Sequence, residues 1–148
     1  MVIDRYFILG GIQMKAYSKE NIRNVAIAGH GARGKTTLAE AMLYLSGASD
    51  RLGKVADGNT VLDFDAEEKK RKVSVSSALA YFEWRDRKVN IIDTPGLFDF
   101  EGARAEGLRA ADSVIVVLSC GHNVDVGAEK TLRAAGKKGL SKFIVVTK

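Results

Sequence analysis

The sequence has little of several features that would assign a chain to other classes. Its one cysteine, Cys120, excludes an internal disulfide and suits a reducing cytosol; we expect this residue to be a small packing residue or a bystander. No apolar run is long enough to span a bilayer, which predicts a soluble chain that does not enter a membrane. Aromatic residues are few at 7%, yet 148 residues with 46% hydrophobic content are enough for one globular domain with a core.

Positive charge exceeds negative charge by 5 in this chain. Nucleic acid is the usual acidic partner of a basic protein, although surplus lysine also confers solubility. The basic run at residues 69–72 has the charge to meet an RNA backbone. A solvated surface is the alternative, because four acidic residues nearby partly neutralise the run: Asp63, Asp65, Glu67 and Glu68.

A glycine-rich segment, GHGARGKTT at residues 29–37, fits the phosphate-binding pattern G-x-x-x-x-G-K-[ST]. A short apolar strand is predicted before it at 24–28, and a helix after it, with one apolar face formed by Leu38, Ala41, Met42 and Leu45. In this order, backbone N–H groups and the positive end of the helix point at the same place. We predict phosphate binding by Gly29, His30, Gly31, Ala32, Arg33, Gly34, Lys35, Thr36 and Thr37.

Two side chains of this loop have specific expected roles. Lys35 would reach the β- and γ-phosphates as a mobile charge, and the Thr36 hydroxyl would ligate the Mg²⁺ that bridges them. A second motif, IIDTPG at 91–96, is an apolar strand that ends in Asp93 and continues into a turn. Asp93 can hold Mg²⁺ through a water, and the Gly96 N–H is open to the γ-phosphate because no side chain blocks it.

Residues 46–72 are rich in Gly, Asp and Lys and predict a long surface loop with at most a short helix. A P-loop protein that senses the γ-phosphate needs a mobile segment that folds over the nucleotide, and this loop is placed to be one. Ser74 is our candidate for the hydroxyl that reaches the metal; an ordinary strand serine is the alternative. The stretches 73–84 and 88–93, joined by a turn at 85–87, predict a hairpin.

The rest of the chain alternates helices and strands. A helix is predicted over 102–111, a buried strand over 113–119, a helix over 126–135 and another buried strand over 142–147. The fold class is therefore α/β, a P-loop NTPase with a mainly parallel sheet, helices on both faces and one antiparallel hairpin. The ligand is expected at the carboxyl ends of the strands.

The chain from about residue 14 to its end resembles the amino-terminal part of the G domain of elongation factor G, and most closely the elongation factor G-like paralogues of bacteria. The resemblance is carried by GHGARGKTT followed by LAEAML, then DGNTVLDFDAEEKKRKVSVSSAL, then DTPGLFDF. It implies GTP and GDP as ligands, Mg²⁺ as cofactor, and the ribosome, rRNA and ribosomal proteins included, as partner. It also implies a cytoplasmic, monomeric GTPase of protein biosynthesis, acting in translocation or ribosome release.

The resemblance also assigns residues. It places Asp93, Thr94, Pro95 and Gly96 in the second switch and Ser74 at a switch position that threonine usually holds, so the metal ligands would be Thr36, Ser74 and Asp93. Thr147 and Lys148 would begin the guanine-reading motif, whose aspartate lies beyond the end of the chain, so the G domain is expected to be incomplete.

One departure from the family concerns catalysis. Leu97 stands where the family has a histidine that positions the attacking water, and leucine cannot orient water, so no catalytic residue is assigned. A GTPase that is weak alone and stimulated by ribosomes is the first hypothesis. A ribosome-binding GTP switch that hardly hydrolyses is the second, and a generic P-loop ATPase is the third. His30, Asp99 and Glu101 receive no role in the chemistry.

Residues 1–13 differ in character from the rest of the chain. Their apolar piece is too short for a signal-peptide core, and Asp4 stands where positive charge would be expected. Met14 is a candidate for the biological start. We therefore expect 1–13 to be an upstream extension and 14–148 to be the G domain; a genuine strand at the sheet edge is the alternative.

Overall fold

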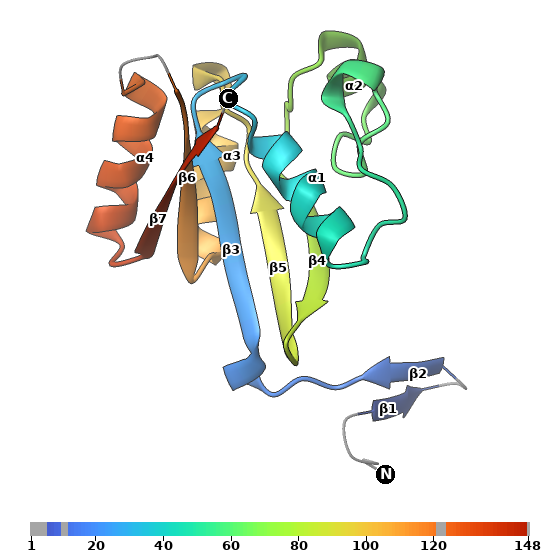
Figure 1. Cartoon of the computed structure of the whole chain (residues 1–148). Helices are drawn as coiled ribbons and strands as arrows, with labels where there is room; N and C mark the ends of the chain where they lie inside the picture. The colour runs from blue at the N-terminus through green and yellow to red at the C-terminus, as the bar shows by residue number, and fades with distance from the viewer. Residues whose placement is uncertain (1–5, 10–11, 121–123, 148) are drawn as a thin grey trace.

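A five-stranded sheet forms the centre of the molecule (Figure 1). The computed structural model describes residues 6–9, 12–120 and 124–147. The strand order is β4-β5-β3-β6-β7, and every pair is parallel except β4 with β5. The strands are β3 (Ile22–Gly29), β4 (Ala78–Trp84), β5 (Arg87–Asp93), β6 (Ser113–Ser119) and β7 (Ser141–Thr147).

Helices cover both faces of this sheet (Figure 1). On one face lies α1 (Lys35–Leu45) with α2 (Ala66–Arg71) beyond it, and on the other lie α3 (Glu101–Ala110) and α4 (Val126–Lys137). The described residues also form three short 3₁₀ turns, η1 (Lys19–Asn21), η2 (Val55–Asp57) and η3 (Phe98–Phe100). Alternate strand residues feed two cores: Ile27 and Ile91 pack on the α1 side, whereas Ala26 and Ile92 pack on the other. The predicted α/β fold is confirmed, and the main sheet has one antiparallel hairpin, as expected.

The predicted apolar face of α1 is confirmed only in part. Leu38 and Met42 are partly buried and pack against the core, but Leu45 is 77% exposed. The buried positions lie on a neighbouring face: Lys35, Thr36, Ala39, Glu40 and Leu43. The apolar pattern did not indicate the buried face of α1, because that face contains a charged residue, Glu40. Burial of Glu40 depends on partners from a distant part of the chain.

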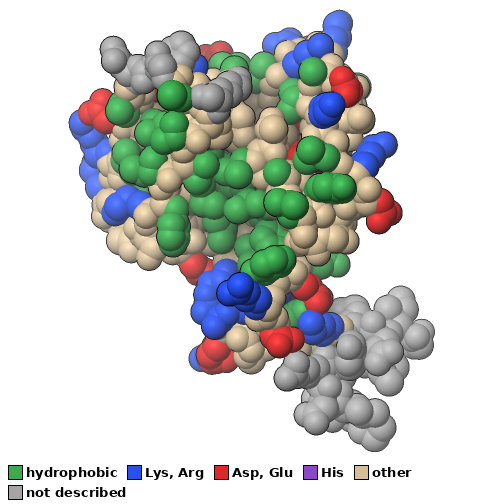
Figure 2. Space-filling model, in the orientation of Figure 1, with side chains coloured by type: hydrophobic (Ala, Val, Ile, Leu, Met, Phe, Trp, Pro, Cys, Tyr) green, Lys and Arg blue, Asp and Glu red, His purple; other side chains and the backbone are tan. Residues whose placement is uncertain are grey.

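The last strand is also exposed where a buried strand was predicted. Phe143 is 60% exposed, and Ile144 and Val146 are similarly open. The reason is that β7 is an edge strand, paired with β6 alone among the described strands. Figure 2 shows a broad apolar area on this side of the molecule. Within the described ranges, no helix has the length and apolarity needed to cross a bilayer.

The segment between α1 and β4 contains only η2 and α2 as regular structure, so the expected surface loop with a short helix is confirmed. Asp65 is the N-cap of α2. Its side chain accepts from the Glu67 N–H at 2.8 Å, and it forms a capping box with Glu68, whose carboxylate accepts from the Asp65 N–H. The hairpin is also confirmed, but β4 begins at Ala78, five residues later than predicted. Its turn places both Arg85 and Asp86 at positive φ, as a two-residue type I′ turn requires.

The amino-terminal strands β1 (Tyr6–Leu9) and β2 (Ile12–Lys15) pair only with each other among the described strands. They form an antiparallel ribbon that lies apart from the main sheet (Figure 1). Neither β1 nor β2 therefore adds a strand to the edge of the five-stranded sheet, which was the alternative expectation.

Candidate nucleotide site

The glycine-rich loop connects the carboxyl end of the central strand β3 to the first residue of α1. Gly29 has φ +144°, and a Cβ there would lie 2.6 Å from the Val117 carbonyl oxygen, so no larger residue fits. Gly34, at φ +84°, is the residue before the helix. Beside the loop is a cavity of about 230 Å³. Its lining residues are Gly31, Ala32, Gly34, Lys35, Thr36, Thr37, Val55, Asp63, Lys72, Val73, Ser74 and Gly96.

Lys35 and Gly96 join the two predicted phosphate motifs. The Lys35 ammonium is buried and donates to the His30 carbonyl 2.9 Å away. Burial lowers the pKa of Lys35, and the charge of Asp93 opposes this shift. A Cβ on Gly96 would run into Lys35 Nζ and lie 2.6 Å from the Gly31 nitrogen. The DTPG turn therefore lies directly against the loop.

Three predicted metal ligands meet at one corner of the site, where Thr36 and Ser74 line the cavity and the buried Asp93 contacts Thr36. The Thr36 hydroxyl donates to Asp93 Oδ2 at 2.6 Å, and Ser74 Oγ lies 3.3 Å from Thr36 Oγ1. The other carboxylate oxygen, Asp93 Oδ1, is buried and has no hydrogen-bond partner among the described residues. Hard cations such as Mg²⁺ take oxygen ligands of this kind, so the residues fit a magnesium ion.

Burial raises the pKa of Asp93 to about 7. The Thr36 hydrogen bond and the Lys35 charge favour the ionised form, but desolvation outweighs them. A cation next to this carboxylate would favour the ionised form, so metal binding and loss of the Asp93 proton are coupled.

Asp63 belongs to the same corner, although no sequence pattern indicated it. Its carboxylate is buried and accepts from Ser74 Oγ at 3.1 Å and from Thr60 Oγ1 at 3.0 Å. In the sequence, Asp63 is only one of several acidic residues near the basic run at 69–72. The folding of residues 60–74 back on themselves brings Asp63 to the hydroxyl.

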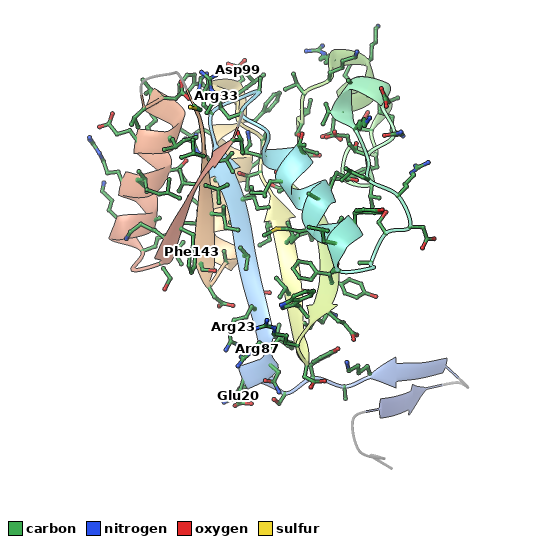
Figure 3. All side chains as sticks on the ribbon, viewed as in Figure 1. Glu20, Arg23, Arg33, Arg87, Asp99 and Phe143 are labelled. Carbon is green, nitrogen blue, oxygen red and sulfur yellow. The ribbon has the colours of Figure 1, made fainter. Side chains whose placement is uncertain are left out.

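Several predicted site residues point elsewhere with their side chains. Thr94 is fully buried and its hydroxyl donates to the Ile27 carbonyl, so it ties β5 to β3; Pro95 is buried beside it. The Arg33 guanidinium makes two bonds to Asp125, at 2.8 and 2.9 Å, near the start of α4. These three residues do not line the cavity with their side chains. Figure 3 shows Arg33 at the end of the molecule where the loop lies.

The end of β7 contacts the glycine-rich loop. Thr147 Oγ1 lies 2.7 Å from the Arg33 carbonyl oxygen, and its side chain packs beside Gly34. The predicted first residue of the base-reading motif is therefore next to the phosphate loop. Lys148, the second, lies outside the described residues.

Leu97, which the resemblance places where the family has a histidine, follows the DTPG turn and lies against the glycine-rich loop. Its Cδ2 atom would lie 3.1 Å from a Cβ on Gly31, so the side chain covers the loop. Asp99 and Glu101 are not among the described residues that line the cavity, and Glu101 pairs with Arg104 at 2.7 Å. The His30 ring centroid lies 5.7 Å from that of Phe98, and a Cβ on Gly127 would come within 3.2 Å of His30 Nδ1.

Gly96→Ala is expected to weaken nucleotide binding by about 10- to 100-fold, since overpacking of this kind typically costs about 1–3 kcal/mol. The added methyl would displace Lys35 or the loop backbone at Gly31. Titration calorimetry with GTP and Mg²⁺ measures the effect. Gly102→Ala is the matched control, because a Cβ there meets nothing within 4 Å. Equal affinities of the two variants would refute the close packing as a requirement for binding.

A glycine-rich loop between a central parallel strand and a helix, with a strand-end aspartate beside its lysine and threonine, defines a P-loop nucleotide-binding domain. The family can be given more closely. Residues 20–148 match the family described as Elongation factor Tu GTP binding domain, and the chain belongs to this family of GTP-binding domains.

Similar proteins include translation factors from several organisms. Elongation factor G of Granulibacter bethesdensis is 36% identical over 135 residues, which are 91% of this chain and 20% of that protein. The mitochondrial ribosome-releasing factor 2 of Culex quinquefasciatus is 38% identical, over 88% of this chain and 17% of that protein. The chain thus spans about a fifth of the length of these relatives.

Solved structures of similar proteins have the same fold over most of this chain. A protein of Thermus thermophilus superposes with a TM-score of 0.83 and 41% identity, over 86% of this chain and 19% of that one. A bacterial selenocysteine-specific elongation factor superposes with a TM-score of 0.67 and 29% identity, over 84% of this chain and 19% of that one. The resemblance to elongation factor G is confirmed.

Proposed function

We propose that this chain is the GTP-binding part of a cytoplasmic translational GTPase, which binds Mg-GTP and Mg-GDP and hydrolyses GTP on the ribosome in elongation or ribosome release. The observation that carries the proposal is the meeting of Lys35 and Thr36 with Gly96 and Asp93, in a chain of the GTP-binding family. The ribosome, through its RNA and proteins, is the partner that the similar factors' names suggest. We also propose that the protein acts as a monomer.

In the proposed site, backbone N–H groups of residues 31–37 bind the phosphates at the positive end of α1. Lys35 moves its ammonium from the His30 carbonyl to the β- and γ-phosphates, and the Gly96 N–H meets the γ-phosphate. Thr36, Ser74 and Asp93 would hold Mg²⁺, Asp93 through a water. The chemistry that a bound Mg²⁺ supplies is neutralisation of charge on the phosphate oxygens.

The proposed hydrolysis is slow in the isolated chain. Leu97 offers no donor or acceptor for the attacking water, and it covers the loop beside Gly31. The ribosome would have to complete the arrangement around the water. The same observation favours the second candidate, a GTP-binding switch that docks on ribosomes and hardly hydrolyses.

The test is GTP and ATP affinity with Mg²⁺, measured on a chain extended through the complete G domain so that the base-reading aspartate is present, followed in the same sample by phosphate release on adding ribosomes. We expect tighter binding of GTP than of ATP and faster release with ribosomes, and a further increase in the Leu97→His variant. Equal GTP and ATP affinities would favour a generic ATPase. Tight GTP binding without ribosome-stimulated release would refute hydrolysis and leave the switch.

A further inference from the structure

Glu40 is a fully buried carboxylate on α1 that the phosphate chemistry does not use. Its Oε1 atom accepts from two consecutive backbone groups, the Val61 N–H at 2.8 Å and the Leu62 N–H at 3.0 Å. A side chain on Gly53 would run into the carboxylate and come within 2.8 Å of Thr60 Cα. Residues 53–62 therefore wrap closely around this one charged group.

The two anchored residues lead directly into the predicted metal corner. Leu62 is 2% exposed and packs in the core on the α1 side, which fixes the chain just before Asp63. Asp63 then accepts the Ser74 hydroxyl, and Ser74 lies beside Thr36. A continuous set of contacts thus connects the interior of α1 with the hydroxyl proposed to reach the metal.

A second carboxylate fixes the other side of Ser74. Glu68 Oε1 accepts from the Val75 N–H at 2.9 Å and from the Ser76 N–H at 3.1 Å. Glu68 is part of the same segment, on α2, so it shapes that segment internally. Glu40 differs because it belongs to the helix that follows the phosphate loop.

A charge at position 40 has a cost that an apolar residue would avoid. Burying a carboxylate is unfavourable unless hydrogen bonds compensate it, and the second oxygen, Oε2, is buried with no partner among the described residues. A leucine would fill the space on this face of α1 but offers no acceptor. The Val61 and Leu62 N–H groups of residues 53–62 both donate to Glu40 and need such an acceptor.

We propose that Glu40 is a positioning residue that anchors residues 53–63 to α1, so that Asp63 holds the Ser74 hydroxyl at the metal corner. The inference rests on the proposed function, since it takes Thr36 and Ser74 as Mg²⁺ ligands in the GTP state. A segment that senses the γ-phosphate contributes more to GTP binding than to GDP binding. Loss of the anchor is therefore expected to weaken GTP binding more than GDP binding.

The test compares Glu40→Ala with Glu40→Gln, which keeps an acceptor oxygen for the two N–H groups. Hydrogen exchange at the Val61 and Leu62 amides reports the anchor without any nucleotide, and fluorescent GTP and GDP report affinity with Mg²⁺. For Glu40→Ala we expect roughly tenfold faster exchange at both amides and roughly tenfold weaker GTP binding, with GDP binding changed less than about threefold. Glu40→Gln should stay near the parent in both.

The control is Glu106→Ala, an exposed glutamate on α3. Unchanged exchange in Glu40→Ala, or an equal loss of GTP and GDP affinity, would overturn the proposal, as would a Glu40→Gln variant that behaves like Glu40→Ala. If the parent binds neither nucleotide, the proposed function fails, whereas the exchange rates still decide whether the anchor exists.

Thermal unfolding shows whether Glu40→Ala folds. If it does not fold, Asp63→Ala is used instead, because it removes the hydrogen bond between Asp63 and Ser74 and leaves α1 unchanged. The same selective loss of GTP affinity is then expected. Equal losses for GTP and GDP in Asp63→Ala would overturn the proposal.

Discussion

Lys35→Ala is expected to lower GTP affinity by about 100- to 1000-fold, the largest loss for any single side chain of the site. The ammonium is buried at the contact between the glycine-rich loop and Gly96, where a bound phosphate is proposed to lie. A hydrogen bond to a charged group contributes about 1.5–3 kcal/mol, and Lys35 would serve two phosphates. Titration of the variant with GTP and Mg²⁺ measures the loss.

Lys137→Ala is the matched control for this experiment, because Lys137 is an exposed lysine in the last turn of α4. It should bind GTP as the parent does. Retention of GTP affinity within about threefold in Lys35→Ala would contradict the assignment of the cavity as the phosphate site.

Asp93→Asn is expected to have two opposite effects. With no metal present, burial holds the pKa of Asp93 at about 7, above the ordinary value of 3.8, so between these pH values the folded chain binds more protons than the unfolded chain. The free energy of unfolding contributed by this group therefore falls as pH rises from about 4 to 7. The difference corresponds to about 4 kcal/mol, since one pKa unit is about 1.4 kcal/mol.

Asparagine has the same shape and no charge to desolvate. The metal-free variant should therefore be more stable than the parent at pH 8 and nearly equal to it at pH 4, as measured by urea unfolding with a chelator present. Its GTP binding should lose most of its dependence on Mg²⁺, because the carboxylate is gone. Asp50→Asn, an exposed position, is the control.

A difference in unfolding free energy between Asp93→Asn and parent that does not change between pH 4 and pH 8 would show that Asp93 is not the group that titrates. Mg²⁺-dependent GTP binding that survives in Asp93→Asn would remove Asp93 from the metal corner. The two measurements are independent, because the first is made without metal and nucleotide.

The sequence by itself determined the order of elements and the positions of the two phosphate motifs. Both depend on local physics: glycines at 29 and 34 permit the backbone that the loop needs, apolar runs form strands, and an aspartate that ends a parallel strand lies at the sheet edge where ligands bind. These properties are set within about ten residues of chain. The α/β fold and the place of the site could therefore be predicted.

Only the tertiary structure decided which side chains those motifs use and which faces are buried. Thr36 meets Asp93 across 57 positions of the chain, and Thr147 meets Arg33 across 114. Glu40 is buried because two amides from a later segment bond it, and β7 is exposed because it forms the sheet edge. Burial and hydrogen bonding depend on neighbours in space, and a pattern along the chain does not specify neighbours that far away.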